Sequence, residues 1–222
     1  RRLKSNNVTI LEVFTSNVSQ IRTITEMMEE LQFNVYALIC AGRVFKTDFA
    51  EEVKSGWWQS SHILDSMPWY PESKRAPGEF SKMTSQEFAA EYEAAWNEPP
   101  SYLAAAQFAA FCALSQAIET AASLNPQVVA AQLHNMSLHE FYGDISFGPV
   151  GTIAMQTVIV QLLEASDANT TPQAVYPDQE AIARFVFPKP TWAQQRCRTF
   201  TRECYGHGKC TMSGTCVCDE GW

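Results

Sequence analysis

The chain has 222 residues, a formal net charge of −8 at pH 7, 46% hydrophobic residues and 12% aromatic residues. The negative charge and the lack of a basic stripe exclude a nucleic-acid-binding protein. The length predicts one or two domains, and the apolar content is ample for a packed core. The sequence shows no initiator Met, signal peptide or transmembrane segment and opens abruptly at Arg1, so we expect a piece of a longer protein.

The first part of the sequence predicts a β-α-β unit. The β-branched run 8–14 (VTILEVF) predicts a strand, and Asn17 with Gln20 three residues later predicts a capping box. Apolar residues then share one helical face as far as Leu31, and the apolar run 35–40 predicts a second strand. Two such strands are expected to be parallel, with a right-handed crossover.

The next hundred residues predict mostly helices. A short helix is expected at 48–54 and a third strand at 57–64, followed by a crossing segment without elements at 65–82, where prolines and charges gather. Thr84 and Glu87 form the pattern of a capping box and predict the start of the next helix.

The clearest helix signature is 99–122 (PPSYLAAAQFAAFCALSQAIETAA). Ser101 follows two prolines as a competent N-cap, and alanines alternate with larger apolar residues. Polar residues break the run below the roughly 20 apolar residues that a bilayer span needs, so we expect a buried helix of a soluble protein. Asn125 and Pro126 predict the start of a further short helix. Beyond it we expect strands at 144–147, 153–163 and 186–187, and a polar loop at 167–172.

Cysteines and sequons indicate the compartment. Five of the seven cysteines lie between Cys197 and Cys218, which predicts a disulfide framework in an oxidising compartment. A zinc ribbon would need two C-x-x-C pairs, and the tail has none. Cys40 and Cys112 stand apart and are expected to be buried apolar residues. Four N-x-[ST] sequons favour a eukaryotic secretory protein and predict glycosylation at Asn7, Asn17, Asn135 and Asn169.

No catalytic motif is found in the sequence, which lacks a G-x-S-x-G elbow, a phosphate loop and H-E-x-x-H. Cys40 and Cys112 have no identifiable catalytic partner. The histidines show no metal-ligand spacing and are expected to be exposed or structurally hydrogen-bonded: His62, His134, His139 and His207. We therefore expect a protein that is not an enzyme and that holds neither a cofactor nor a metal.

Candidate ligand contacts follow the predicted parallel strands, because ligands of such sheets bind beyond the carboxyl ends of the strands. The first strand end offers an aromatic ring and hydroxyls, and the second offers a glycine and a cation. The start of the central helix adds backbone N–H groups that favour an anion or a carbonyl. The candidate binding residues are Phe14, Thr15, Ser16, Gly42, Arg43, Ser101 and Tyr102. Core packing, capping or solvent exposure remains the plainer alternative for each.

An ordered set of segments between residues 6 and 190 resembles the later half of a type I periplasmic-binding-protein fold, in the branched-chain amino acid and amide receptor group. The segments are NVTILEVFTSNVSQI, ALICAG, EFAAEYEAAWNEPPSYLAAAQFAAFCALSQAIETA and FYGDISFGPVG. The resemblance implies an incomplete two-lobed α/β fold around a ligand cleft, with Tyr102 as a cleft aromatic. Amino-acid binders of the family carry an acidic residue after the second strand, where this sequence has Ala41-Gly42-Arg43. That departure leaves amides, organic anions or no ligand open.

The tail, residues 193–222, resembles an epidermal-growth-factor-like (EGF-like) module that is cut short before its sixth cysteine. Its pattern is C-x6-C-Y-G-H-G-K-C-x5-C-V-C-D-E-G-W. The resemblance implies the bridges Cys197–Cys210 and Cys204–Cys216, with Cys218 unpaired. No acidic residue lies in 192–196, just before the first cysteine, so calcium is not expected.

These observations predict an extracellular, non-catalytic receptor fragment, either secreted or the ectodomain of a membrane protein. A small polar molecule (an amide, an organic anion or an amino-acid-like compound) would bind between the lobes. The EGF-like module would act as a spacer or contact a protein partner. The alternative is a structural or adhesion protein whose two-lobed region binds no small ligand.

Overall fold

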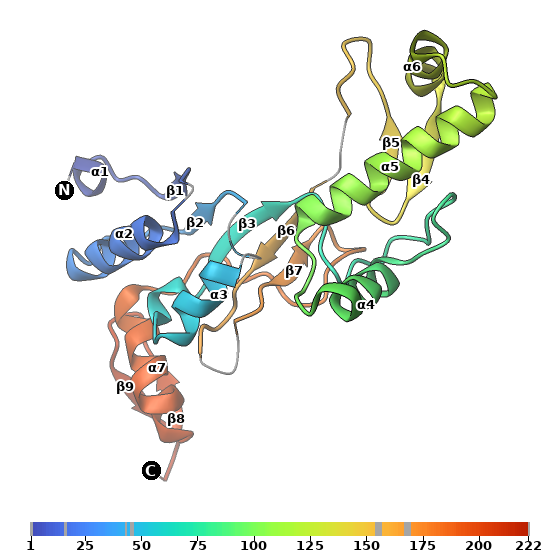
Figure 1. Cartoon of the computed structure of the whole chain (residues 1–222). Coiled ribbons are helices and arrows are strands. Elements are labelled where there is room, and N and C mark those ends of the chain that lie inside the picture. Colours follow the sequence, from blue (N-terminus) through green and yellow to red (C-terminus); the bar gives the residue numbers. More distant parts are fainter. Residues whose placement is uncertain are drawn as a thin grey trace. The chain divides into compact units, whose positions relative to one another are not determined.

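The computed structural model of the chain describes residues 2–15, 17–42, 44, 47–153, 157–166 and 170–221 (Figure 1). The chain forms two compact units, which are described separately. The sheet unit comprises Arg1–Ser66, Ile159–Tyr176 and Ala181–Trp222, and the helical unit comprises Met67–Val158 and Pro177–Glu180. Among the described residues, no helix is both long and apolar enough to cross a membrane.

A five-stranded mixed sheet, in the order β1-β2-β3-β6-β7, organises the sheet unit. Its strands are β1 (Ile10–Val13), β2 (Ala37–Cys40), β3 (Ile63–Met67), β6 (Val158–Gln161) and β7 (Gln173–Tyr176). The pairs β1–β2 and β2–β3 are parallel and β6–β7 is antiparallel. The helix α2 (Val18–Glu30) joins β1 to β2, which confirms the predicted β-α-β unit.

The start of α2 differs from the expected capping box. Asn17 is the N-cap, and its Oδ1 accepts the Ser19 N–H at 2.9 Å. The Gln20 side chain does not reach back to the cap, because its Oε1 accepts a hydrogen bond from the Thr15 hydroxyl at 2.5 Å. The buried face of α2 includes Val18, Ile21 and Met28.

The expected strand 57–64 is wrong for residues 57–62 and right only for the last two. Residues Trp58–Ser60 form the 3₁₀ helix η1, and β3 begins only at Ile63. Trp57 is fully buried, and its indole Nε1 donates to Thr25 Oγ1 at 2.9 Å, so this ring is anchored against α2. The Ser60 hydroxyl donates to the Trp57 carbonyl at 2.6 Å and stabilises the turn. The strand then runs on to Met67, three residues into the expected crossing segment.

The remaining elements of the sheet unit are short or lie in the tail. They are α1 (Arg2–Ser5), α3 (Thr47–Lys54), α7 (Trp192–Tyr205) and the antiparallel hairpin of β8 (Gly208–Cys210) and β9 (Cys216–Cys218). The helix α7 was not predicted from the sequence. Its first residue, Trp192, is fully buried, and its indole Nε1 donates to the Phe33 carbonyl at 2.7 Å. The tail is therefore joined to the sheet unit through a buried ring.

The helical unit contains α4 (Ser85–Trp96), α5 (Tyr102–Ala121), α6 (Pro126–Asn135) and the antiparallel hairpin of β4 (Ser137–Glu140) and β5 (Gly143–Ser146). The predicted capping box of Thr84 and Glu87 is confirmed at α4. Asn125 caps α6 and Pro126 is its first residue, as predicted. An apolar core joins these elements, and its buried members are Trp69, Phe88, Ala105, Ala109, Ala113, Leu138, Phe141, Tyr142 and Ile145.

Only one face of α5 is buried, so the expectation of a buried helix holds in part. The small residues Ala105, Ala109 and Ala117 are at most 1% exposed. The larger residues Leu103 and Phe111 are 51% and 64% exposed. Alanine allows close packing of α5 on the core, and Leu103 and Phe111 lie on the outer face, whereas Phe108 packs against the core beside Phe88 and Phe141.

The crossing segment after β3 has no helix or strand from Pro68 to Thr84, as expected, and a buried ion pair fixes it. Glu180 Oε1 lies 3.1 Å from Arg75 Nε, and the two side chains are only 8% and 11% exposed. Glu180 Oε2 also accepts the Lys74 N–H at 3.0 Å and the Ser73 hydroxyl at 3.1 Å. Both charges are therefore largely compensated within the helical unit.

The late strands differ most from prediction. Within 153–163 the structure has β6 (Val158–Gln161) and an isolated bridge from Ile153 to Phe147, while 154–156 lie outside the described residues. Neither β4 nor β7 was predicted, whereas β5 confirms the strand expected near 144–147. The expected strand 186–187 is not a strand, because the Val186 N–H donates to the Gln161 side chain (Oε1, 3.0 Å) instead of to a neighbouring strand. The predicted loop at 167–172 is described only from Thr170 on.

Candidate functional site

The first group of predicted ligand contacts lies where β1 ends. Phe14 directly follows the strand and is 77% exposed. The Thr15 hydroxyl oxygen accepts the Asn17 N–H at 3.1 Å, so this residue also shapes the entry into α2. Ser16 lies outside the described residues. Phe14 therefore exposes its ring at the carboxyl end of a parallel strand, and its role as a ligand contact stays a prediction.

The second group lies where β2 ends. Gly42 has φ +71°, a left-handed conformation that glycine adopts at no steric cost. Its N–H donates to Asp65 Oδ1 at 2.7 Å, and the Val44 N–H donates to Asp65 Oδ2 at 3.2 Å. Arg43 lies outside the described residues. The backbone of Gly42 is therefore engaged by a carboxylate of this chain.

Asp65 is the residue of this region that sequence reasoning missed. It is fully buried within β3, next to β2. The signal in the sequence was a single acidic residue inside the apolar run Ile63-Leu64-Asp65. The acidic residue that amino-acid binders of the resembled family carry after the second strand is absent from this sequence. The Asp65 carboxylate reaches the turn after β2 from the neighbouring strand β3 and accepts backbone N–H groups there.

The cysteine at the end of β2 is not arranged as a nucleophile. Burial first, and the negative charge of Asp65 second, raise the pKa of the Cys40 thiol to about 12. Burial likewise raises the pKa of the Cys112 thiol to about 11. Both thiols stay protonated at neutral pH, and a protonated thiol is a poor nucleophile. The prediction that both are buried is confirmed.

The third group lies at the start of α5 in the helical unit. Ser101 is the predicted N-cap, and its Oγ accepts the Ala104 N–H at 3.2 Å. Tyr102 is partly buried against the apolar core of that unit. The strand-end residues thus belong to the sheet unit, whereas Ser101 and Tyr102 belong to the helical unit. That the two sets line one cleft stays a prediction.

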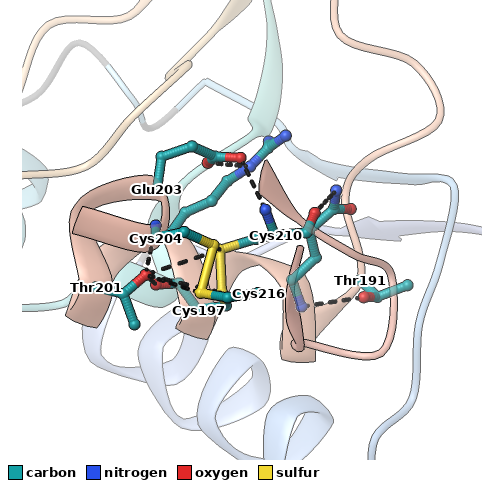
Figure 2. Close-up of polar contacts among 9 residues, drawn as sticks. Thr191, Cys197, Thr201, Glu203, Cys204, Cys210 and Cys216 are labelled. Atoms are coloured by element: carbon teal, nitrogen blue, oxygen red, sulfur yellow. Dashed lines mark hydrogen bonds and ion pairs between the residues drawn. A yellow bond between two sulfur atoms is a disulfide. The ribbon is translucent and has the colours of Figure 1, made fainter. Parts of the chain in front are cut away.

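The tail contains the predicted disulfides (Figure 2). Cys197 is bonded to Cys210 and Cys204 to Cys216, which confirms the pairing implied by the resemblance, and Cys218 is unpaired and exposed. The four bonded sulfur atoms lie within 4.8 Å of one another. In disulfide form they offer no thiolate to a metal ion.

Side chains next to the two disulfides accept hydrogen bonds from the backbone of the cysteines. The Cys204 N–H donates to Thr201 Oγ1 at 2.8 Å, and the Cys210 N–H donates to Glu203 Oε1 at 3.0 Å. Figure 2 shows Thr201 and Glu203 beside the paired sulfur atoms. The limits of a separate module at 193–222, and its EGF-like character, stay predictions.

Three of the four predicted glycosylation sites can be placed. Asn7, Asn17 and Asn135 are exposed, and Asn169 lies outside the described residues. Asn17 caps α2 through Oδ1, while Asn135 donates from Nδ2 to the Ala131 carbonyl at 2.9 Å. Use of these sites stays a prediction.

The histidines differ in environment. His139 Nδ1 lies 2.6 Å from Asp144 Oδ1, which agrees with a structurally hydrogen-bonded histidine. His62 contradicts that expectation, because it is only 8% exposed and its Nδ1 has no hydrogen-bond partner among the described residues. Its main chain is fixed just before β3, where the His62 N–H donates to the carbonyl of Leu162, the residue after β6, at 2.5 Å.

Comparison with solved structures defines the fold. No family model matches the chain. A leucine-binding protein from Thermotoga maritima is similar with a TM-score of 0.58 and 18% identity, over 77% of this chain and 44% of that protein. A branched-chain amino acid ABC transporter periplasmic ligand-binding protein from Burkholderia xenovorans is similar with a TM-score of 0.58 and 14% identity. The match covers 84% of this chain and 46% of that protein. A solute-binding protein of an ABC transporter from R. palustris, solved with benzoate, is similar with a TM-score of 0.52 and 14% identity. The match covers 81% of this chain and 47% of that protein.

The chain therefore has a mixed α/β fold like part of a type I periplasmic binding protein, with a disulfide-bonded tail. It spans about half the length of the solved structures it matches. This confirms the predicted fold class.

Proposed function

We propose that the chain is part of a non-catalytic, extracellular ligand-binding region that takes up a small polar molecule between two lobes. The observation that carries the proposal is the likeness to solute-binding proteins, combined with candidate contacts at the carboxyl ends of β1 and β2, where ligands of parallel sheets bind. The ligand class is an amide, an organic anion or an amino-acid-like compound. The tail would act as an EGF-like spacer or contact a protein partner.

Two features of the chain support an extracellular setting. The tail is held by two disulfides, and such bonds persist in oxidising compartments. The sequons at Asn7, Asn17 and Asn135 are exposed and so are accessible to glycosylation enzymes. The compartment is either the medium or the outer face of a membrane.

Tyr102 is the best single test of the proposed cleft. It is the first residue of α5, where the helix dipole favours a carboxylate or a carbonyl, and its ring gives an apolar face with a hydroxyl. Because a hydrogen bond to a charged group contributes roughly 1.5–3 kcal/mol, Tyr102→Phe should weaken ligand binding about tenfold or more, and Tyr102→Ala should weaken it further.

The experiment is a thermal-shift screen of the protein against amides, amino acids and small carboxylates, followed by calorimetric titration of the Tyr102 variants. Tyr92→Phe, on α4, is the matched control and should bind as the wild type does. If a ligand binds and the Tyr102 variants bind it equally well, the cleft is misplaced. If nothing binds, the adhesion alternative is favoured.

A further inference from the structure

A cavity of about 460 Å³ lies in the sheet unit, away from the strand ends discussed above. Its walls come from the loop before β3, the loop after β6 and the helix α7. Ser61 and His62 precede β3, so the cavity is at the amino end of that strand, whereas the predicted ligand contacts follow the carboxyl ends of β1 and β2. Cavities of several hundred Å³ are the size that small ligands occupy.

Several buried polar atoms in the cavity wall lack a hydrogen-bond partner among the described residues: Gln195 Oε1, His62 Nδ1 and Arg198 Nε, the last of which lies within ion-pair distance of Glu203. Gln195 is 3% exposed, and its Nε2 donates to the Pro190 carbonyl at 2.6 Å, which fixes the orientation of the amide. Its Oε1 therefore remains as an acceptor, and it has no hydrogen-bond partner among the described residues. His62 Nδ1 is also buried and has no hydrogen-bond partner among the described residues. Buried polar groups are almost always hydrogen-bonded, so Gln195 Oε1 and His62 Nδ1 indicate a bound molecule that is polar.

The charges around the cavity favour an anion. Arg198 and Arg202 line it, and Arg198 Nε lies 2.9 Å from Glu203 Oε2. Arg202 is exposed and forms no ion pair within the described part of the chain. Burial, and then the positive charges of Lys189 and Arg198, lower the pKa of His62 to about 4. At neutral pH the ring is uncharged, and the positive potential that acts on it is available to a negative ligand.

Lys189, which does not line the cavity, adds to this potential in its charged form; burial lowers its pKa to about 7, so this contribution grows as the pH falls below neutral. It is 5% exposed, and its Nζ lies 3.4 Å from the centroid of the Trp192 ring and has no hydrogen-bond partner among the described residues. Glu164 and Glu203 are the acidic residues of the lining. Glu203 is already paired with Arg198, and Glu164 is exposed, so Arg202 retains its charge for a ligand.

We propose that this cavity binds a small carboxylate that carries a hydrogen-bond donor next to its carboxyl group. Arg198 and Arg202 hold the carboxylate, and the Gln195 side-chain oxygen accepts the hydrogen bond from the donor. The donor is a hydroxyl or an ammonium group. The site is separate from the proposed cleft and does not depend on it. A cavity filled only by water is the competing explanation, since water also satisfies buried polar atoms.

Three C4 dicarboxylates that differ in a single substituent test the proposal: L-malate has a hydroxyl, L-aspartate an ammonium group and succinate neither. Each is titrated calorimetrically into the 222-residue chain, secreted from a eukaryotic host so that its disulfides form. At least one of malate and aspartate should bind about fivefold more tightly than succinate, because a single hydrogen bond separates them. The better of the two identifies the donor.

Two variants locate the site. Arg202→Gln changes an exposed residue and should lower the affinity for each of the three ligands by about tenfold. Gln195→Met removes the acceptor and should abolish the preference over succinate while leaving succinate binding in place. The ratio of the two affinities is the readout, so a general loosening of α7 does not mimic the result. Arg196→Gln is the matched control, because Arg196 lies on the same helix but pairs with Glu29 outside the cavity.

The proposal is overturned if none of the three ligands binds at millimolar concentration, which leaves water as the occupant. It is also overturned if the wild type binds all three equally, or if Arg202→Gln and Gln195→Met leave the affinities and their ratio unchanged. A carboxylate that loses affinity in Tyr102 variants but not in cavity variants binds in the proposed cleft, so failure of one proposal is distinguishable from failure of the other.

Discussion

Replacement of Asp65 by Asn should loosen the turn that follows β2. The carboxylate is fully buried, and it accepts the N–H groups of Gly42 at 2.7 Å, Ser66 at 2.7 Å and Val44 at 3.2 Å. Asn keeps one acceptor oxygen, but its NH₂ group cannot accept a hydrogen bond. At least one of the backbone N–H groups would then face a donor and lose its partner.

The size of the effect follows from these contacts. Hydrogen bonds to charged groups contribute about 1.5–3 kcal/mol each, so losing one and weakening the others should lower the free energy of unfolding of the sheet unit by about 2–4 kcal/mol. Relief from burying a charge acts in the opposite direction and sets the lower end of that range. Urea denaturation measures the loss, and hydrogen exchange of a peptide that contains Gly42 and Val44 locates it.

Asp144→Asn is the matched control for this change. Asp144 pairs with His139, but its side chain is 80% exposed, and surface ion pairs contribute about 0–1 kcal/mol. If Asp65→Asn costs no more than this control, or if amide protection at Gly42 is unchanged, then Asp65 does not hold the turn.

Three further predictions concern other parts of the chain. Non-reducing peptide mapping should recover Cys197 linked to Cys210, and replacing both by Ser should cost roughly 2–4 kcal/mol; a bridge from Cys197 to any other cysteine would contradict the structure. The pKa of His62 is lowered from 6.5 in the unfolded chain to about 4 in the folded chain. Between these values the unfolded chain binds a proton at His62 and the folded chain does not, so stability falls as the pH drops from 6.5 to 4. His62→Asn, which tolerates the φ of +65° there, should reduce that fall by as much as about 3 kcal/mol, and an unchanged pH profile in urea denaturation would refute the assignment. The exposed Phe111 should make the chain prone to associate, so Phe111→Glu should lower light scattering without loss of stability, whereas Ala109→Glu on the buried face should unfold the helical unit.

The sequence alone determined the features that depend on neighbouring residues. The N-caps at Ser101 and Asn125 and the capping box at Thr84 each join a side chain to backbone groups a few residues away, so their patterns are readable in one dimension. The same holds for the β-α-β unit, since strand, helix and strand follow one another within about forty residues. The spacing of the cysteines, through its resemblance to EGF-like modules, also gave the correct pairing.

Tertiary structure decided the features that depend on distant residues. Trp57 leaves the expected strand because its indole reaches Thr25 in α2, and Val186 fails to form a strand because Gln161 takes its N–H. Local secondary-structure propensity carries no information about such contacts, because the two partners are 25 or more residues apart in the sequence. The same reason explains why Asp65 and Gln195 escaped notice. Each is an unremarkable polar residue in the sequence, and only the packing of β3 against β2, or of α7 beside the cavity, shows that it is buried and what it contacts.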